Sequence, residues 1–239
     1  MMLPLIAIDG PAGAGKSSTA LAAANKLGIP YLDTGALYRA ATWAVMNKGI
    51  SPKNSEGVAS YIKSVKFIIL NTATESRVFV NGVDTTDYLR SPELTRNVSD
   101  VCEITEVRER LFFLQRDWAA RGFGVVEGRD IGTVILPDAK LKIFITAKPE
   151  IRALRRARDL NIQNDPQAIA KLAQEIAERD KRDMSRPNAP LSQAEDAVLL
   201  DTSDLTFQQQ LDVIINLAAE RFELRSYTLQ TPQIAGKQE

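Results

Sequence analysis

A glycine-rich loop ending in lysine and serine constrains the fold of this chain more than any other feature. Residues 10–17 read Gly-Pro-Ala-Gly-Ala-Gly-Lys-Ser, with an apolar run (Leu3 to Ile8) before them and a helix-forming stretch (Ser17 to Leu27) after them. Glycines let successive backbone N–H groups face inward around phosphate oxygens, and the following helix adds its positive dipole end. A plain turn between strand and helix is the alternative. The complete pattern in this context favours a nucleotide-binding P-loop.

The residues of this loop are expected to have different roles on a nucleoside triphosphate. Lys16 would bridge the β- and γ-phosphates, and Ser17 would place its hydroxyl on a Mg²⁺ ion. Ser18 and Thr19 could reach the α-phosphate from the first turn of the helix. The predicted ATP-binding residues are Gly10, Pro11, Ala12, Gly13, Ala14, Gly15, Lys16, Ser17, Ser18 and Thr19.

Further apolar runs predict an α/β fold around a parallel sheet. They recur along the chain, mostly separated by helical patterns, at Pro30 to Leu32, Gly124 to Val126, Leu141 to Ile145 and Ala197 to Leu200. This rhythm predicts a P-loop kinase fold, with a five-stranded parallel sheet flanked by helices. Between Val65 and Val83 the pattern changes and ends in an Asn-Gly turn signal, which predicts an antiparallel β insert.

We expect residues 1–220 to form a single P-loop kinase unit. Its core would comprise 1–62, 122–150 and 190–220, with a monophosphate-binding insert at about 63–121 and a helical lid at about 151–189. The lid is read from two arginine-rich helical stretches with a polar break at 161–165. Arg155 and Arg156 are lid candidates for ATP phosphates, although a solvated helix explains them about as well. Residues 221–239 are expected to form a poorly ordered tail.

The composition excludes several kinds of chemistry. Lysine plus arginine number 30 and aspartate plus glutamate number 30, so no overall field attracts nucleic acid or a membrane, and no run reaches transmembrane length. The chain has no histidine and one cysteine, Cys102, which removes imidazole catalysis, the usual zinc ligands and internal disulfides. Phosphoryl transfer in a cytoplasmic setting fits best, and we expect a monomer because coiled-coil heptads are absent.

Three further clusters suit an acceptor phosphate. Asp33 to Arg39 and Glu127 to Thr133 each follow a predicted strand, at the carboxyl edge where open α/β sheets bind ligands. One face of a predicted helix carries Arg179, Arg182, Asp183 and Arg186. A structural ion pair or a solvated helix face could explain the second and third clusters separately. Together with the loop, they favour a kinase.

With these clusters assembled, the chain resembles the bacterial cytidylate kinases from the P-loop to about Ala218. The shared motifs are Ile8 to Pro11 with Gly13 to Lys16, Asp33 to Arg39, Gly128 to Thr133 with Pro137 to Ala139, Glu178 to Asp180, Arg182, Asp183, Arg186, and Ala189 to Leu191. The resemblance implies Mg²⁺-assisted transfer of the γ-phosphoryl group of ATP to CMP or dCMP. A P-loop kinase with another small acceptor is the alternative. A nucleotide-dependent switch lacks support, since no Asn-Lys-x-Asp motif is present.

The resemblance also implies roles for individual residues. The catalytic residues would be Lys16, Arg129, Arg179 and Arg186. The substrate-binding residues would be Thr34, Tyr38, Arg39, Ser99, Arg108, Gly128, Arg129, Asp130, Asp183 and Arg186. Within this set, the cytosine edge would be read by Ser99, Arg108 and Asp130, the acceptor phosphate held by Arg39 and Arg129, and the sugar bound by Asp183.

The pairing of Ser99 with Arg108 carries a geometric condition. Residues nine apart on one continuous helix face opposite ways, so the two side chains could not share a base. We therefore expect a helix break near Glu103 to Thr105, with Thr105 as the N-cap of a new helix. A straight helix through residues 97–118 would rule the pairing out.

Overall fold

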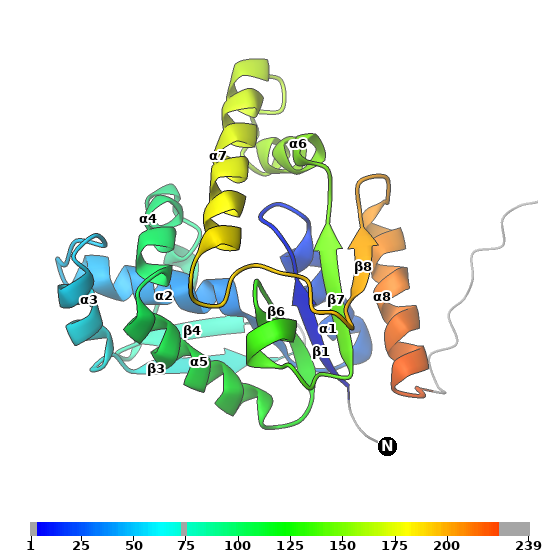
Figure 1. The fold of residues 1–239 in the computed structure, drawn as a ribbon, viewed down its shortest axis with the longest axis horizontal. Coiled ribbons are helices and arrows are strands. Elements are labelled where there is room, and N and C mark those ends of the chain that lie inside the picture. The colour runs from blue at the N-terminus through cyan, green and yellow to red at the C-terminus, as the bar shows by residue number, and fades with distance from the viewer. Residues whose placement is uncertain (1–3, 73–75, 225–239) are drawn as a thin grey trace, which may run out of the picture.

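Two sheets of different kinds organise the computed structural model, which describes residues 4–72 and 76–224 (Figure 1). The larger sheet is parallel, in the order β2-β6-β1-β7-β8, and the smaller is antiparallel, in the order β3-β4-β5. The strands are β1 (Leu5–Asp9), β2 (Tyr31–Asp33), β3 (Phe67–Asn71), β4 (Ser76–Val80), β5 (Val83–Asp84), β6 (Gly124–Gly128), β7 (Leu141–Thr146) and β8 (Val198–Asp201). The predicted five-stranded sheet and antiparallel insert are confirmed.

Helices cover both faces of the large sheet, because its strands are apolar on both sides. On β1, Ile6 and Ile8 join the core that α1 and α8 cover, whereas Ala7 joins the core beneath α2 and α5. The helices are α1 (Lys16–Leu27), α2 (Thr34–Asn47), α3 (Ser55–Ile62), α4 (Pro92–Cys102), α5 (Thr105–Ala119), α6 (Pro149–Asp159), α7 (Pro166–Ser185) and α8 (Phe207–Arg221), with a 3-10 turn η1 (Thr86–Tyr88) and a π-helical turn η2 (Ile131–Ile135).

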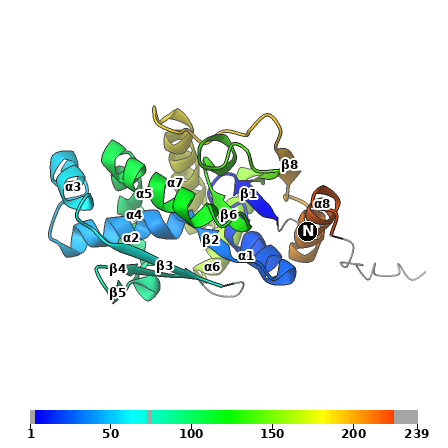
Figure 2. The same cartoon turned by 90° about the horizontal axis from the view of Figure 1, so that it is seen from below.

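The small sheet packs one face against α2 and runs alongside it (Figure 2). Val78 and Val80 of β4 are buried in that interface, while Ile68 and Leu70 of β3 are exposed on the other face. Asn81 and Gly82 form the turn between β4 and β5, with φ values of 50° and 85°. Positive φ at both turn positions is what a two-residue hairpin needs, which explains the Asn-Gly signal.

The predicted break between two helices is present, but its cap is different. α4 ends at Cys102 and α5 begins at Thr105, with Ile104 as an extended N-cap that supplies no side-chain hydrogen bond. The prediction of Thr105 as the cap is therefore wrong. Thr105 already lies inside the first turn, and its hydroxyl oxygen accepts a hydrogen bond from Asn188 Nδ2 at 3.1 Å.

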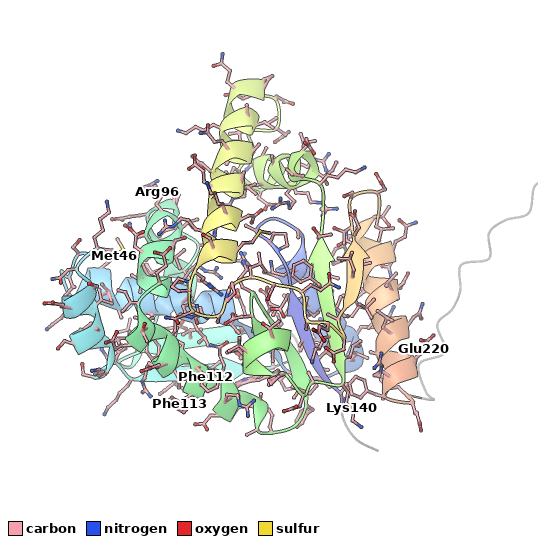
Figure 3. All side chains as sticks on the ribbon, viewed as in Figure 1. Met46, Arg96, Phe112, Phe113, Lys140 and Glu220 are labelled. Carbon is pink, nitrogen blue, oxygen red and sulfur yellow. The ribbon has the colours of Figure 1, made fainter. Side chains whose placement is uncertain are left out.

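Helices α6 and α7 project beyond the carboxyl edge of the large sheet (Figure 1). The polar break predicted between them is present, and Asp165 caps α7 by accepting from the N–H groups of Gln167 and Ala168. Figure 3 shows Phe112 and Phe113 of α5 at the other end of the molecule. The loops after β1 and β6 and the start of α2, which follows β2 directly, lie at the carboxyl edge of the sheet, which brings the candidate site residues together. The tail prediction for 225–239 lies outside the described residues.

Substitution of two glycines with positive φ, one in the P-loop and one after α1, would measure how tightly the P-loop packs against the sheet. A Cβ on Gly10 would lie 1.9 Å from the carbonyl oxygen of Ile145, whereas a Cβ on Gly28 would meet nothing within 4 Å. We expect Gly28→Ala to lower the free energy of unfolding by about 1–2 kcal/mol, from backbone strain alone. Gly10→Ala should cost at least about 3 kcal/mol, because strain and overpacking add. Urea denaturation measures both, and equal losses would contradict this packing.

Candidate active site

The P-loop joins β1 to α1 as the sequence predicts. Gly13 and Gly15 adopt φ values of 75° and 91°, which leaves the loop backbone curled ahead of the helix N-terminus. Lys16 is the first residue of α1, and its Nζ donates a hydrogen bond to the carbonyl oxygen of Pro11 at 2.8 Å. A curled loop backed by a helix dipole and a lysine is an anion-binding site.

Three hydroxyl groups follow this lysine and point in different directions. Ser17 Oγ donates to Glu127 Oε1 at 2.6 Å, while Ser18 is exposed and donates to the carbonyl oxygen of Gly15 at 3.0 Å. Thr19 is fully buried, with its hydroxyl 2.8 Å from the same carbonyl oxygen. This geometry does not support the α-phosphate role expected for the Thr19 side chain. Ser18 presents the accessible hydroxyl.

Two buried carboxylates shape the site although sequence reasoning assigns them no role. Glu127 of β6 accepts hydrogen bonds from Ser17 and, at 3.1 Å, from the hydroxyl of Tyr31. Asp9, the last residue of β1, accepts the backbone N–H groups of Ile131 at 2.8 Å and Gly132 at 2.7 Å. Asp9 therefore connects the strand before the P-loop to the segment that follows β6, which we call the acceptor loop (residues 129–135). The feature of the sequence that could have identified both residues is a carboxylate at the carboxyl end of a buried strand.

Burial dominates the protonation of these groups. It raises the pKa of Asp9 to about 6 although the two backbone hydrogen bonds act against it, and it also raises the pKa of Glu127. Burial lowers the pKa of Lys16 to about 7, helped by the nearby charges of Arg129 and Arg179. Without a nucleotide, the lysine therefore sits in surroundings that disfavour its charged form. A phosphate would reverse that preference.

The start of α2 supplies the first acceptor-side cation. Asp33 caps the helix by accepting the N–H of Ala36 at 2.8 Å, and its other oxygen pairs with Arg39 Nη2 at 2.8 Å. Thr34 is buried, and its hydroxyl donates to the carbonyl oxygen of Glu127 at 2.8 Å, beside Gly128 at the end of β6. The Thr34 hydroxyl is therefore engaged with β6, which leaves Arg39 as the group able to meet a phosphate.

A buried ion pair stands where base recognition was expected. Arg108 Nη2 lies 2.5 Å from Asp130 Oδ2, and the Arg108 guanidinium lies 5.4 Å from the ring centroid of Tyr38. The structure thus brings Arg108, Asp130 and Tyr38 together from α5, the loop after β6 and α2. In the described part of the chain, no hydrogen bond joins Ser99 to Arg108 or Asp130. The place of Ser99 on the base stays a prediction.

The remaining arginines gather around Asp183 of α7. Arg129 Nε donates to Asp183 Oδ2 at 2.9 Å, and Arg186 lies 4.0 Å from Asp183 Oδ1 and 3.5 Å from Asp130 Oδ1. Burial would raise the pKa of Asp183, but the charges of Arg129, Arg179 and Arg186 together hold it below its ordinary value. The carboxylate therefore stays ionised and orients its arginines.

Several arginine nitrogens of this site are buried without a hydrogen-bond partner. They are Arg39 Nε, Arg108 Nη1, Arg179 Nε and Arg186 Nη2, the last of which still lies 3.5 Å from Asp130 Oδ1 in an ion pair. A buried N–H without an acceptor is costly, so such groups favour an anionic or carbonyl-bearing ligand. The guanidiniums of Arg39, Arg108, Arg129, Arg179 and Arg186 also outnumber the carboxylates of Asp33, Asp130 and Asp183 by two. That excess suits the double negative charge of a phosphate monoester.

The two lid candidates differ in their surroundings. Arg155 donates to Thr202 at both its carbonyl oxygen (2.7 Å) and its hydroxyl oxygen (2.9 Å), and to the carbonyl oxygen of Ala14 at 3.3 Å. Arg156 is half-buried, and its side chain makes no hydrogen bond within the described ranges. Arg155 thus lies beside the P-loop, and a role for either residue on ATP stays a prediction.

The fold and the site together define a P-loop kinase whose acceptor carries a phosphate. A donor loop and an arginine cluster face the same edge of one parallel sheet, and both are lined by buried, oriented charges. Within the described residues, no cluster of three or more acidic, cysteine or histidine side chains could hold a metal by itself, and no helix is long and apolar enough to cross a membrane.

Comparison with known proteins assigns the family. A family model described as cytidylate kinase matches residues 6–220, so the chain belongs to the cytidylate kinase family, and the predicted resemblance is confirmed. A cytidylate kinase of Corynebacterium glutamicum is 46% identical over 91% of this chain and 96% of its own length. One of an Exiguobacterium species is 45% identical over 90% of this chain and 96% of its own length.

Two other similar proteins differ in length or in sequence. A bifunctional pantoate ligase/cytidylate kinase of Prochlorococcus marinus is 44% identical over 91% of this chain, which spans only 42% of that relative's length. An uncharacterized protein of Eubacterium ventriosum with a crystal structure has a TM-score of 0.52 and 16% identity, covering 91% of this chain and 99% of its own. The second likeness supports the fold alone.

The lowered pKa of Lys16 predicts that nucleotide binding takes up a proton. At pH 8 a lysine with a pKa of about 7 is roughly nine-tenths deprotonated, and a triphosphate beside it should restore the charge. We expect uptake approaching one proton per ATP bound, measured by calorimetry in buffers of different ionisation enthalpy. Lys16→Arg, which stays charged, should bind ATP with little uptake. Equal proton uptake by both proteins would contradict this account of Lys16.

The same group makes stability depend on pH in the nucleotide-free protein. Between pH values of about 7 and 10.5 the unfolded chain keeps the Lys16 proton that the folded protein has lost, so the free energy of unfolding should rise with pH over this window. The rise should be smaller in Lys16→Arg. Urea denaturation of both proteins at several pH values measures the difference, and parallel profiles would exclude Lys16 as its source.

Proposed function

We propose that this chain transfers the γ-phosphoryl group of ATP to CMP or dCMP, giving CDP or dCDP and ADP. The observation that carries the proposal is the buried Arg108–Asp130 pair, which lies beside arginine nitrogens that lack acceptors. The names of the relatives agree with this activity. A kinase of the same family with another small acceptor is the alternative, and it would need a different partner for Asp130.

Cytosine is the base whose edge matches this pair. It offers a donor at N4 and acceptors at N3 and O2, so Asp130 would accept from N4 while Arg108 donates to the acceptor atoms. Uracil carries an oxygen at C4, which would face the Asp130 carboxylate unfavourably. Ser99 would add a contact to the base from the end of α4, and Tyr38 would hold the Arg108 guanidinium in place.

The other end of the acceptor would lie among the remaining arginines. Arg39 and Arg129 would hold the phosphate of CMP, and Asp183 would hydrogen-bond the sugar. Lys16, Arg179 and Arg186 would stabilise charge on the transferring phosphoryl group. No strong general base is needed, because an acceptor phosphate oxygen is already nucleophilic. In-line alignment lowers most of the barrier.

The residues at the P-loop fit a magnesium ion. Mg²⁺ prefers oxygen ligands and is usually bound by one or two carboxylates together with substrate phosphates and water. Ser17 and Glu127 place a hydroxyl and a carboxylate oxygen 2.6 Å apart beside the loop. These two groups would hold the ion, directly or through water, and the ion would neutralise charge on the triphosphate.

The proposed function also assigns roles to two segments of the chain and a location to the enzyme. Residues 63–121 would serve as the monophosphate-binding insert, and 151–189 as a lid that excludes water when both nucleotides are bound. In that closed state Arg155 and Arg156 would approach the ATP phosphates. We propose that the enzyme works in the cytoplasm as a monomer, without nucleic acid or membrane partners.

Acceptor specificity tests the function directly. The protein is supplied with ATP, Mg²⁺ and each of CMP, dCMP, UMP, AMP and TMP, and ADP release is followed. We expect CMP and dCMP to be used far better than the others. Asp130→Asn should lower kcat/KM for CMP about 10- to 100-fold, because one hydrogen bond to a charged group is lost. It should also reduce the ratio of kcat/KM for CMP to that for UMP.

Asp117→Asn is the matched control for this variant. Asp117 is exposed on α5, the helix that carries Arg108. The substitution should leave kcat/KM for every acceptor unchanged. Turnover of all acceptors at similar rates, or an unaltered CMP preference in Asp130→Asn, would reject the cytosine assignment.

A further inference from the structure

One ion pair between α6 and α7 holds the P-loop by a single residue. Asp180 Oδ1 accepts the backbone N–H of Ala12 at 3.2 Å, and Arg152 Nη1 donates to the carbonyl oxygen of Ala12 at 3.1 Å. Arg152 and Asp180 also hydrogen-bond each other. Both main-chain polar groups of Ala12 are thus engaged by the two helices. We call Arg152 and Asp180 the clamp pair.

The clamp pair is buried, and both of its members are hydrogen-bonded to the backbone. Arg152 is 7% exposed and Asp180 is 6% exposed. Arg152 Nε also donates to the carbonyl oxygen of Ala147 at 2.9 Å, just beyond the end of β7. A buried ion pair is stable only when hydrogen bonds offset its desolvation, and here they come from fixed backbone groups. Arg152 Nε and Nη1 and both carboxylate oxygens of Asp180 are bound to backbone groups or to each other, so the geometry of the pair indicates positioning.

The position of Asp180 on α7 links the clamp pair to the acceptor site. Asp180 follows Arg179 directly and precedes Asp183 by three residues on the same helix. Any displacement of α7 relative to Ala12 would therefore move Arg179 and Asp183 relative to the ATP phosphates. The C-terminal end of α7 is also held to α4, because Arg182 pairs with Asp100 at 2.8 Å and with Glu103 at 2.9 Å.

We propose that Arg152 and Asp180 are positioning residues that set the separation between the donor phosphates and the site residues on α7 and at its C-cap, Arg179, Asp183 and Arg186. Through them, ATP bound in the P-loop orders α7 and so prepares the acceptor site. The inference rests on the proposed kinase function. Neither residue touches the reacting atoms, and both act through Ala12 and through α7. In-line transfer is sensitive to such placement, since an error of about 1 Å can cost about 10²-fold in rate.

The kinetic test separates positioning from binding. Asp180→Asn keeps an acceptor for the Ala12 N–H but removes the charge, and Arg152→Lys keeps the charge but loses the forked geometry. For both variants we expect kcat per folded molecule to fall about 10- to 100-fold, while KM for ATP and for CMP changes less than about threefold. The control is Lys181→Gln, an exposed neighbour on α7, which should behave as the unaltered protein.

A double variant distinguishes a loss of positioning from a loss of folding. Removing one member of a buried pair leaves an unpaired charge and can unfold the protein, so Arg152→Met with Asp180→Leu removes both together. We expect this double variant to fold, as judged by thermal unfolding, and to show the same loss in kcat. A folded Asp180→Asn or double variant with unaltered kcat would overturn the proposal. So would a loss confined to ATP affinity.

Hydrogen exchange tests the link without using the acceptor. With Mg²⁺ and the β,γ-imido analogue of ATP, amide exchange should slow both in residues 10–19 and in residues 166–185 of the unaltered protein. In Asp180→Asn, protection should stay within residues 10–19. Protection of α7 in both proteins, or in neither, would contradict the inference. Failure of the unaltered protein to phosphorylate CMP while this exchange pattern holds would reject the proposed function and leave the link standing.

Discussion

Carboxylates at the ends of three adjacent parallel strands, two of them buried and one half-buried, hold the backbone on which the rest of the site depends. Asp33 ends β2 and fixes the start of α2, Glu127 near the end of β6 orients Ser17, and Asp9 ends β1 and holds the acceptor loop. Removing a carboxylate from water is costly unless hydrogen bonds or cations compensate. Here the compensation comes from backbone N–H groups and side chains of the loops themselves. The donor and acceptor loops are therefore built on one rigid edge.

Electrostatics then divides this edge into two parts. On the donor side, burial and two arginine charges lower the pKa of Lys16, so that side is prepared for a polyphosphate. On the acceptor side, Asp130 and Asp183 orient arginines, and Arg108 Nη1 is buried there without a hydrogen-bond partner. Each part is incomplete without an anion, and the clamp pair on α6 and α7 keeps the two parts in register. Positioning, more than acid–base chemistry, is what such a site contributes to phosphoryl transfer.

Patterns of short range predicted most of the fold and the P-loop, whereas the roles of the substrate-binding residues came from the resemblance to the cytidylate kinases. The alternation of apolar runs predicted the parallel sheet, and the condition on Ser99 and Arg108 predicted the break between α4 and α5. Contacts between distant elements were not predictable. Arg152 and Asp180 lie on helices whose charged faces look solvated, and only the approach of both helices to Ala12 buries them. The hydroxyls of Thr34 and Thr19 turn inward for the same reason. The N-cap of α5 is Ile104, one residue before the predicted Thr105, although Ile104 offers no capping side chain.

The account requires that a donor and an acceptor nucleotide bind together, phosphate to phosphate, at one edge of the sheet. A single molecule with adenosine and cytidine joined by five phosphates would fill both parts at once. Calorimetry should find it bound at least about 10²-fold more tightly than ATP. The cytidine end would bind its site without a second loss of translational and rotational entropy. The corresponding molecule with uridine in place of cytidine should lose most of this gain. An affinity equal to that of ATP alone would contradict the shared edge and with it the account of the site.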